Sequence, residues 1–252
     1  MEDSVCQRFR TRRIFGIPFL AESSARVRAA AWAPGLTVVP SGPGLASLPH
    51  DAAYANAVRS ADRALTDSGL LVLAWAGLTG EWLPRTSGLR LVQEALDADG
   101  QRMSDQTLWV MPDAAEARRT TTYLRSRSMT LDAARDVYVA PMYSRQRIED
   151  EVLLAQIRAR NPRLVVLCLG SGVQEVLGWW LRQRLEPCPA IWCTGAALAF
   201  LTGGQAPIGT LVDRLMLGWL WRILHRPGPF LWRYGRAIPL VWALVQARRR
   251  LQ

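Results

Sequence analysis

Histidine is scarce and lysine is absent in this 252-residue chain, which narrows the chemistry that its side chains can perform. Only His50 and His225 are present, and none of the four cysteines has CxxC spacing. A zinc site built on histidines, or a Ser-His-Asp triad, is therefore not expected. The cysteine spacing favours a reduced, cytoplasmic protein. Because all 31 basic residues are arginine, the chemistry must come from carboxylates and arginines.

Three loops carry the polar and glycine residues from which a site could be built, namely TDSG at 66–69, CLGSGVQE at 168–175 and TGAALAFLTGGQAP at 194–207. In the second loop, an apolar run leads into two glycines and then into a helix whose first residues include Gln174 and Glu175. Backbone amides at such a helix start favour an anionic group. A simpler interpretation is also open, in which the glycines make a tight turn and Glu175 caps the helix dipole.

The elements that position these loops are six short β-rich runs alternating with segments of helical character. The runs lie at 36–39, 63–66, 107–111, 136–140, 164–170 and 190–193. This alternation is typical of βαβ units and predicts an α/β fold with a mainly parallel sheet flanked by helices. Ligands bind beyond the carboxyl ends of the strands in such a sheet, where we expect the three loops to lie.

A helix is expected after Ser144, and its pattern of apolar residues is explicit. The sequence places Ile148, Val152, Leu153 and Ile157 on one face of this helix, with charged residues elsewhere. The sequence NPR that follows predicts the end of the helix and the start of a buried strand.

The chain divides by composition into three parts. Residues 1–34 are a basic, irregular extension with no predicted element, residues 35–207 form the expected core, and residues 208–252 form an Arg- and Trp-rich appendage. From residue 214 onward the appendage holds eight arginines, four tryptophans and neither Asp nor Glu. This composition suits the headgroup layer of an anionic membrane. Nucleic acid is the rival partner and is less favoured, because the appendage contains the apolar sequence LMLGWLWRIL.

No signal peptide and no membrane-spanning helix are predicted. The apolar run at 14–20 is short and interrupted by Gly and Pro. The uncharged interval at 187–212 is broken by glycines and prolines and is interpreted as strand, loop and turn. We therefore expect a peripheral protein at the inner, cytoplasmic face of the plasma membrane.

Five segments resemble, in their order and spacing, the WecG/TagA/CpsF family of bacterial glycosyltransferases from about Val38 to Tyr234. SADRALTDSG at 60–69 looks like the family's SADxVLxDG, and LPRTSGLRLV at 83–92 looks like its PxRVTGSDLV. LCLGSGVQE resembles VGLGxPKQE, and TGAALAFLTGGQAP resembles GxGaxFDxxaGxxxRAP. LGWLWRILHRP, with the later Arg-Tyr pair, resembles LEWLxRLxxEP and RY.

The resemblance implies a Rossmann-like core with a basic C-terminal appendage that sits on the membrane and helps complete the active site. It implies transfer of N-acetylmannosamine or a related hexose from a nucleotide to a lipid-diphosphate-linked sugar. The family inverts the anomeric centre without a metal or other cofactor and uses one carboxylate as general base. Asp67 matches that base. Without the resemblance, an Asp before Ser-Gly is interpreted as a turn or cap residue.

Binding of the donor requires positive charge, because the leaving nucleotide diphosphate, expected to be UDP, gains negative charge in the transition state. In a chain without lysine, arginine must stabilise it. Arg85 matches the family's core arginine, and Arg222 and Arg233 match arginines of the appendage. Gln174 and Glu175 are the candidates for sugar or nucleotide contacts from the core.

Several family residues are replaced in this chain. The Thr-Pro-Asn of the first family loop is VPS at 39–41, so a hydroxyl for substrate binding survives only if Ser41 supplies it. Two aspartates of the family become Arg90 and Ala199, and its RAP becomes QAP from Gln205. These replacements predict either a different donor and acceptor or partial loss of the catalytic machinery.

Two other functional classes are weaker. A metal-dependent transferase of another fold would use a DxD motif, and Asp97 and Asp99 supply one, but they are interpreted as turn residues at a helix end before Gly100. A basic nucleotide- or nucleic-acid-binding protein is disfavoured because no GxGxxG follows the first strand.

The sequence therefore predicts an inverting, metal-independent hexosyltransferase of exopolysaccharide or surface-glycan assembly. Its expected partners are a nucleotide sugar, a polyprenyl-diphosphate-linked glycan and an anionic membrane surface, with no nucleic acid and with homo-oligomerisation left open. The alternative is a catalytically degenerate homologue that binds a sugar nucleotide, or acts as a scaffold, at the membrane.

Overall fold

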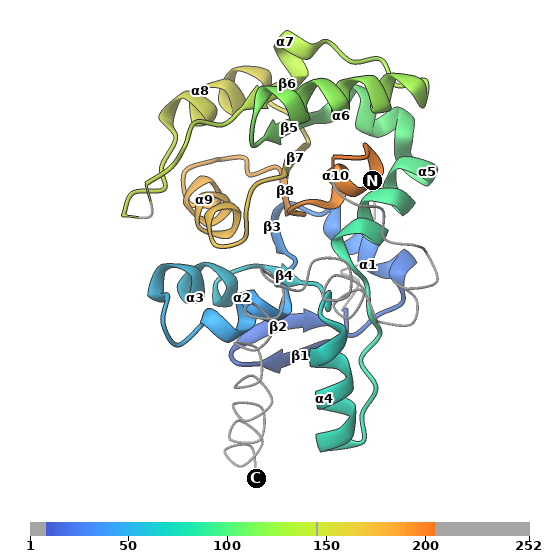
Figure 1. The fold of residues 1–252 in the computed structure, drawn as a ribbon, viewed down its shortest axis with the longest axis vertical. Coiled ribbons are helices and arrows are strands. Elements are labelled where there is room, and N and C mark those ends of the chain that lie inside the picture. Colours follow the sequence, from blue (N-terminus) through green and yellow to red (C-terminus); the bar gives the residue numbers. More distant parts are fainter. Residues whose placement is uncertain (1–8, 145, 205–252) are drawn as a thin grey trace, which may run out of the picture.

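The computed structural model describes residues 9–144 and 146–204, in which helices lie on both sides of one eight-stranded sheet (Figure 1). The strands are β1 (Thr11–Ile14), β2 (Ile17–Leu20), β3 (Gly35–Val38), β4 (Arg63–Ala64), β5 (Thr107–Met111), β6 (Val137–Val139), β7 (Leu164–Leu167) and β8 (Ala190–Cys193). The helices are α1 (Ser24–Ala31), α2 (Gly42–Ser47), α3 (Ala52–Arg59), α4 (Gly69–Thr79), α5 (Gly88–Gln106), α6 (Ala114–Ser126), α7 (Ala133–Asp136), α8 (Glu151–Arg160), α9 (Val173–Arg182) and α10 (Ala197–Leu201).

The strands follow the order β1-β2-β4-β3-β8-β7-β5-β6. Every neighbouring pair is parallel except β1 with β2. A strand forms within, or one residue beyond, each of the six expected runs, so the predicted α/β fold with a mainly parallel sheet is confirmed. β3, β5, β7 and β8 are buried along their whole length, because helices cover both faces of a parallel sheet.

Two hydrophobic cores lie on opposite faces of the sheet, because successive side chains of each strand point to opposite faces. In β8, Ile191 and Cys193 face the core that is covered by α2, α3, α4, α8 and α9. Ala190 and Trp192 face the opposite core, which is covered by α1, α5, α6 and α10. The period of two in a strand produces this division, and in Figure 1 α3 and α9 lie to the left of the central strands while α1, α5 and α10 lie to the right.

The basic segment before β3 contributes to the sheet. β1 and β2 form a hairpin whose two turn residues, Phe15 and Gly16, both have positive φ, as a tight two-residue hairpin turn requires. β2 then pairs in parallel with β4 through Phe19 and Ala64. Phe19 is fully buried, so this part of the chain extends both the sheet and the core.

The helix expected after Ser144 begins later and presents a different face to the core. α8 begins at Glu151, where the side chain of Asp150 caps it by accepting from Leu153 N at 2.8 Å. Leu153, Leu154 and Ile157 are buried, whereas Val152 is 69% exposed. The prediction for Val152 was therefore wrong, because Ile148 lies before the helix and does not set its register.

The end of α8 was predicted correctly. Asn161 adopts the left-handed conformation of a helix C-cap, and its amide donates to Ile157 O. The uncharged interval from residue 187 contains β8 as expected, but it continues into the short helix α10 rather than into loop and turn alone. Among the described residues, no helix is both long enough and apolar enough to cross a membrane. The appendage at 208–252 lies outside the described residues.

Candidate active site

The loops that follow β3, β4 and β8 meet at the carboxyl edge of the sheet. A Cβ atom added to Gly88, the first residue of α5, would lie 3.1 Å from Thr194 O and 3.4 Å from Val39 Cγ1. A Cβ atom added to Gly42 would lie 3.1 Å from Ser68 Oγ. These contacts would be tight for a Cβ atom, so glycine favours the close approach of α2 and α5 to the neighbouring loops. The predicted convergence of loops at this edge is therefore present.

Asp67 lies in the loop directly after β4, and its side chain is half-buried. Its Oδ1 atom accepts from Gly88 N at 3.4 Å, so the carboxylate is placed at the N-terminus of α5. The positive end of the helix dipole favours the ionised carboxylate. Ser68, not Asp67, caps α4, because its Oγ accepts from Leu71 N at 3.2 Å. Asp67 is therefore not the N-cap of the helix that follows it, and its carboxylate contacts the start of α5 instead.

Arg85 lies beside Asp67 in the segment that leads into α5. Its Nε donates to the carbonyl oxygen of Asp67 at 2.7 Å. The same segment is held to the loop by Thr66, whose Oγ1 donates to Pro84 O at 2.8 Å. Asp67 and Arg85 are separated by 18 positions in the sequence, and the structure brings them together as a carboxylate and a guanidinium group at one edge.

Ser41 follows β3 at the same edge and caps α2. Its Oγ accepts from Gly44 N at 3.3 Å, and the residue is half-buried. A hydroxyl that accepts one hydrogen bond retains its own proton for donation to a ligand. The neighbouring contact between Gly42 and Ser68 places Ser41 close to the loop that carries Asp67.

Gln174 and Glu175 are buried at the start of α9, with exposed fractions of 2% and 0%. The carboxylate of Glu175 accepts from Gly172 N at 2.7 Å and from Gln174 Nε2 at 3.0 Å. Gln174 Oε1 in turn accepts from Gly195 N at 2.8 Å. The two side chains therefore tie the loop after β7 to the loop after β8. Glu175 caps its own helix, as the simpler interpretation of the sequence proposed.

The amides at the start of α9 are also engaged within the protein. Gly172 N donates to Glu175, and the amides of Val173 and Gln174 both donate to Gly170 O at 3.2 Å. An anion at this helix start would have to compete with these bonds. Burial raises the pKa of Glu175 to about 7, although the bonds from Gln174 and Gly172 oppose this effect.

Asp97 and Asp99 are each paired with arginine. Asp97 pairs with Arg127, and Asp99 lies 3.3 Å from Arg28 Nε and accepts from the indole of Trp32. The helix end expected before Gly100 corresponds to a kink at Asp99, whose φ/ψ are not helical, and a second helical segment continues α5 to Gln106. Asp97 lies nine residues after the start of α5, roughly 14 Å along the helix. The residues at 9–144 and 146–204 contain no cluster of three or more potential metal ligands.

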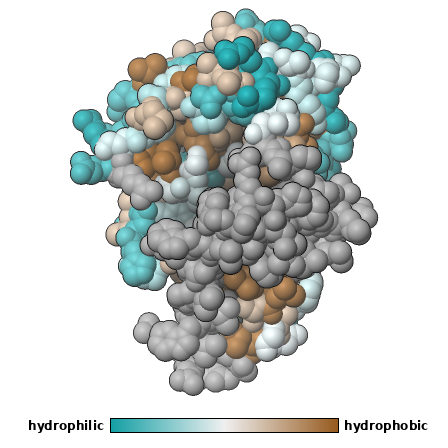
Figure 2. Space-filling view, viewed as in Figure 1, coloured by the Kyte–Doolittle hydropathy of each residue, from teal (hydrophilic) through white to brown (hydrophobic). Residues whose placement is uncertain are grey.

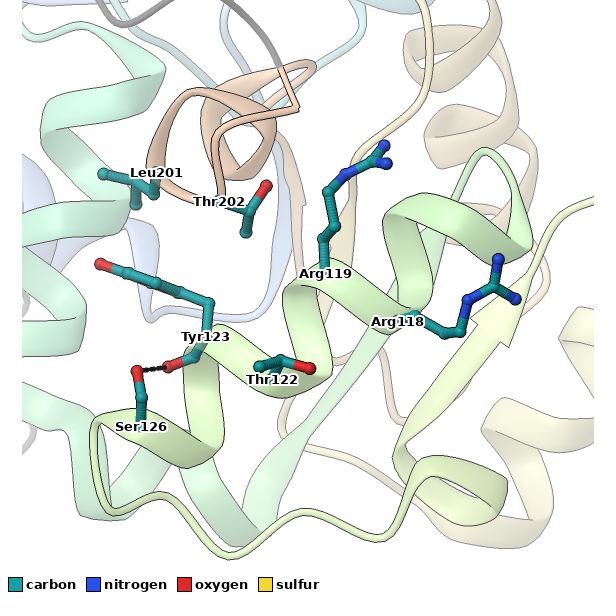
Figure 3. A pocket seen from close by; sticks show the side chains of 7 residues that line it. All are labelled: Arg118, Arg119, Thr122, Tyr123, Ser126, Leu201 and Thr202. Atoms are coloured by element: carbon teal, nitrogen blue, oxygen red, sulfur yellow. Dashed lines mark hydrogen bonds between the residues drawn. The ribbon is translucent and has the colours of Figure 1, made fainter.

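A cavity of about 360 Å³ lies between α6 and α10. Figure 3 shows Arg119 extending from α6 toward α10, where Thr202 lies. Both residues bind the buried carboxylate of Glu116, Arg119 Nη2 at 2.5 Å and Thr202 Oγ1 at 2.9 Å. The sequence analysis did not identify Arg118 or Arg119 as site residues, because no segment compared with the family contains them.

Sequence analysis also missed Gly88, whose amide positions Asp67. A signal was present, since Ser87 precedes an apolar periodic run and its Oγ accepts from Arg90 N at 3.2 Å as a helix cap does. The cap predicts where α5 starts but not that this start faces β4. Arg222 and Arg233 lie outside the described residues, so their predicted roles remain predictions.

No curated protein matches the chain. The model of the glycosyl transferase WecG/TagA/CpsF family matches residues 12–252, which is nearly the whole chain, from the second residue of β1 onward. The protein therefore belongs to the WecG/TagA/CpsF family and is a glycosyltransferase.

Proposed function

We propose that this protein is an inverting, metal-independent hexosyltransferase that uses a nucleotide-diphosphate sugar, UDP-linked, and a polyprenyl-diphosphate-linked glycan acceptor. The reaction belongs to exopolysaccharide or surface-glycan assembly at the cytoplasmic face of the membrane. The observation that carries the proposal is Asp67, a half-buried carboxylate at the carboxyl end of β4 with one oxygen on the amide of Gly88.

Asp67 has the features of a general base. The acceptor hydroxyl must lose its proton as its oxygen attacks the anomeric carbon, and an ionised carboxylate within hydrogen-bond reach takes that proton. The Gly88 amide orients the carboxylate and stabilises its charged form. A single attack from the face opposite the leaving nucleotide inverts the anomeric configuration, so one base is sufficient.

Arg85 supports departure of the nucleotide diphosphate. The bond from its Nε to Asp67 O fixes the guanidinium group beside the base. A guanidinium group forms strong, paired hydrogen bonds with phosphate oxygens, and its charge opposes the negative charge that develops on the leaving group. Arg222 and Arg233 of the appendage are proposed to add positive charge on the same side.

Ser41 is proposed to contact the donor through its hydroxyl, and Gln174 with Glu175 to shape the neighbouring loops rather than to touch the sugar. The buried bonds of Gln174 and Glu175 support this division of roles. Binding of the chain to an anionic membrane is supported by the eight arginines and four tryptophans after residue 213.

The test is a panel of nucleotide sugars incubated with the purified protein and a short-chain lipid-diphosphate sugar, with release of nucleotide diphosphate as the signal. Release that depends on the acceptor and on one donor would establish the reaction. The product's anomeric configuration, measured by NMR, must be opposite to that of the donor.

A non-catalytic homologue remains the second candidate, because Arg90 and Ala199 stand where the family has aspartate. An arginine cannot act in place of a carboxylate. Arg90 is exposed, and its Nε lies 2.7 Å from Glu94 Oε1. Binding of a nucleotide sugar without turnover of any donor would favour this candidate over the transferase.

A further inference from the structure

The helix α4 is apolar on the side that faces the protein and also on the side that faces outward. Its eleven residues, GLLVLAWAGLT, include no charged side chain. Leu71, Val72 and Trp75 are buried and pack into the hydrophobic core. A surface helix normally carries polar residues on its other face, because that face meets water.

The outward side of α4 follows the helical repeat and remains apolar. Leu70, Ala74 and Leu78 are half-buried and pack against the core, whereas Leu73, Ala76 and Gly77 face outward, with the exposed Thr79 at the end of the helix. Leu73 is 48% exposed, and Trp82, just beyond the C-cap at Gly80, is 57% exposed. Figure 2 shows apolar residues gathered at the lower end of the molecule, where Figure 1 places α4. We call Leu73, Ala76, Gly77 and Trp82 the α4 stripe.

Helix α6, which packs against the other face of the sheet, provides a comparison for the outward face of a helix in this protein. Arg118, Arg119, Thr122 and Arg125 are exposed on α6, so water meets charged and hydroxyl groups there. The outward face of α4 differs from that of α6, because it carries no charged side chain. A contiguous apolar surface of this kind on a globular domain indicates a binding surface.

Arginines lie beside the stripe at the edge of the sheet. Arg12 and Arg13 are exposed on β1. Arg12 Nε donates to both carboxylate oxygens of Glu81, at 2.7 and 3.0 Å, which joins β1 to the segment between Gly80 and Trp82. Arg59 binds the hairpin turn through Phe15 O at 3.0 Å. The stripe is therefore bordered by the ion pair of Arg12 and Glu81, while Arg13 and Arg59 add positive charge at the hairpin turn of the same sheet edge.

We propose that the α4 stripe and the β1 arginines form a lipid-binding surface that seats the folded core on an anionic bilayer, in addition to any contact made by the appendage. Leu73 and Trp82 enter the apolar boundary, and Arg12 and Arg13 meet the phosphate groups of the lipids. Apolar side chains, tryptophan and arginine occur together at such boundaries because each suits one depth of the headgroup layer.

The choice of lipid as the occupant, rather than another protein, rests on the charge of the rim and on the proposed function. α4 begins two residues after Asp67, and a helix is about 10–12 Å across. A bilayer against the α4 stripe would therefore hold the carboxyl edge of the sheet within roughly one helix diameter of the headgroups, where a polyprenyl-linked acceptor presents its diphosphate.

The first test measures binding of the full chain to vesicles of phosphatidylcholine with phosphatidylglycerol and to vesicles of phosphatidylcholine alone. The double variant Leu73→Glu with Trp82→Glu is compared with Val152→Glu, since Val152 is an exposed apolar residue on α8. We expect the double variant to bind the anionic vesicles roughly tenfold more weakly and Val152→Glu to bind like wild type. Equal binding by all three proteins would overturn the proposal.

The second test locates the contact even if the appendage dominates total binding. In a background with Cys6 and Cys188 replaced by Ser, single cysteines at position 73 or 152 carry a polarity-sensitive fluorophore. Anionic vesicles should shift the emission of the label at 73 to shorter wavelength and leave the label at 152 unchanged. No shift at 73 would contradict the proposal, and so would a shift produced by protein concentration alone, which would identify a second copy as the occupant.

These measurements do not depend on turnover, so they stay readable if the transferase assay fails. Conversely, transfer to a water-soluble acceptor should be unchanged in the Leu73→Glu, Trp82→Glu variant, because neither residue touches the candidate active site.

Discussion

Asp67 and Glu175 are both carboxylates that accept a backbone amide at the start of a helix, yet they have different surroundings. Asp67 is half-buried and lies beside the guanidinium group of Arg85. Glu175 is fully buried, and its carboxylate binds the amide of Gly172 and the side chain of Gln174. A base must reach a substrate proton, whereas a buried carboxylate with protein partners stabilises the loops around it.

The largest expected effect is on Asp67. Asp67→Asn keeps an oxygen that can accept from Gly88 N but removes the group that takes the proton, so turnover should fall by about 10³. Released nucleotide diphosphate measures the change, and thermal unfolding should be unaltered. Asp113→Asn, at the cap of α6 after β5, is the matched control and should retain activity. Unchanged turnover in Asp67→Asn would remove the distinction between the two carboxylates.

Glu175 should instead determine a pH dependence of stability. Its pKa is raised from 4.5 to about 7 in the folded protein, so the folded state retains a proton that the unfolded state releases between these values. The stabilisation from this group is complete below pH 4.5, declines as the pH rises, and is lost above pH 7. The integrated change is at most about 3 kcal/mol.

Glu175→Gln should remove this decline, because an amide does not titrate. The free energy of unfolding, measured with urea at pH 5 and pH 7.5, should change less with pH in Glu175→Gln than in wild type. Glu149→Gln, which removes an exposed carboxylate paired with Arg147, serves as the control and should keep the wild-type slope. A loss of turnover in Glu175→Gln as large as that in Asp67→Asn would show that Glu175 acts on the substrate.

A smaller effect is expected for Arg85→Lys. Lysine preserves the charge but has no planar pair of donors for a diphosphate, so kcat/KM should fall by about tenfold. The fall should be larger in Arg85→Gln, which also removes the charge. Arg118→Lys on α6 provides a comparison outside the candidate site and should have no effect. An equal response to both lysine variants would argue against a specific role for Arg85.

Addition of EDTA should leave the rate unchanged. We propose that arginine stabilises the leaving group, and Asp97 and Asp99 are each paired with an arginine in the structure. The rate of nucleotide diphosphate release with and without the chelator checks this prediction. A rate that disappears with EDTA and returns with Mn²⁺ or Mg²⁺ would require a metal-assisted mechanism.

Much of the fold could be predicted from the sequence because the central strands are short, apolar and separated by helical segments. The hairpin of β1 and β2 was not predicted, since β1 is an edge strand that exposes Arg12 and Arg13 and lacks a run of apolar residues. Phe15-Gly16 was a weak signal for its turn. In α8, apolar spacing alone placed Val152 inside, whereas the cap at Asp150 sets the start of the helix.

The candidate site was predicted in part. Resemblance to the family identified Asp67 and Arg85, and the structure places them side by side. The sequence could not distinguish Glu175 from a ligand-binding carboxylate, because burial and the bond between Gln174 and Gly195 depend on how two loops from different strands meet. The outward face of α4 was missed for a similar reason, since an apolar helix is buried or exposed according to its neighbours.

By itself, the sequence determined the alternation of strands and helices, the membership of the family and the concentration of arginine near the C-terminal end, since these depend on residue order and local periodicity. Only the tertiary structure decided that the amide of Gly88 meets Asp67, that Glu175 is sealed from water and that the α4 stripe faces outward. Those properties arise from contacts between segments far apart in the chain, and the geometry of such contacts is fixed only when the two layers of helices pack against the sheet.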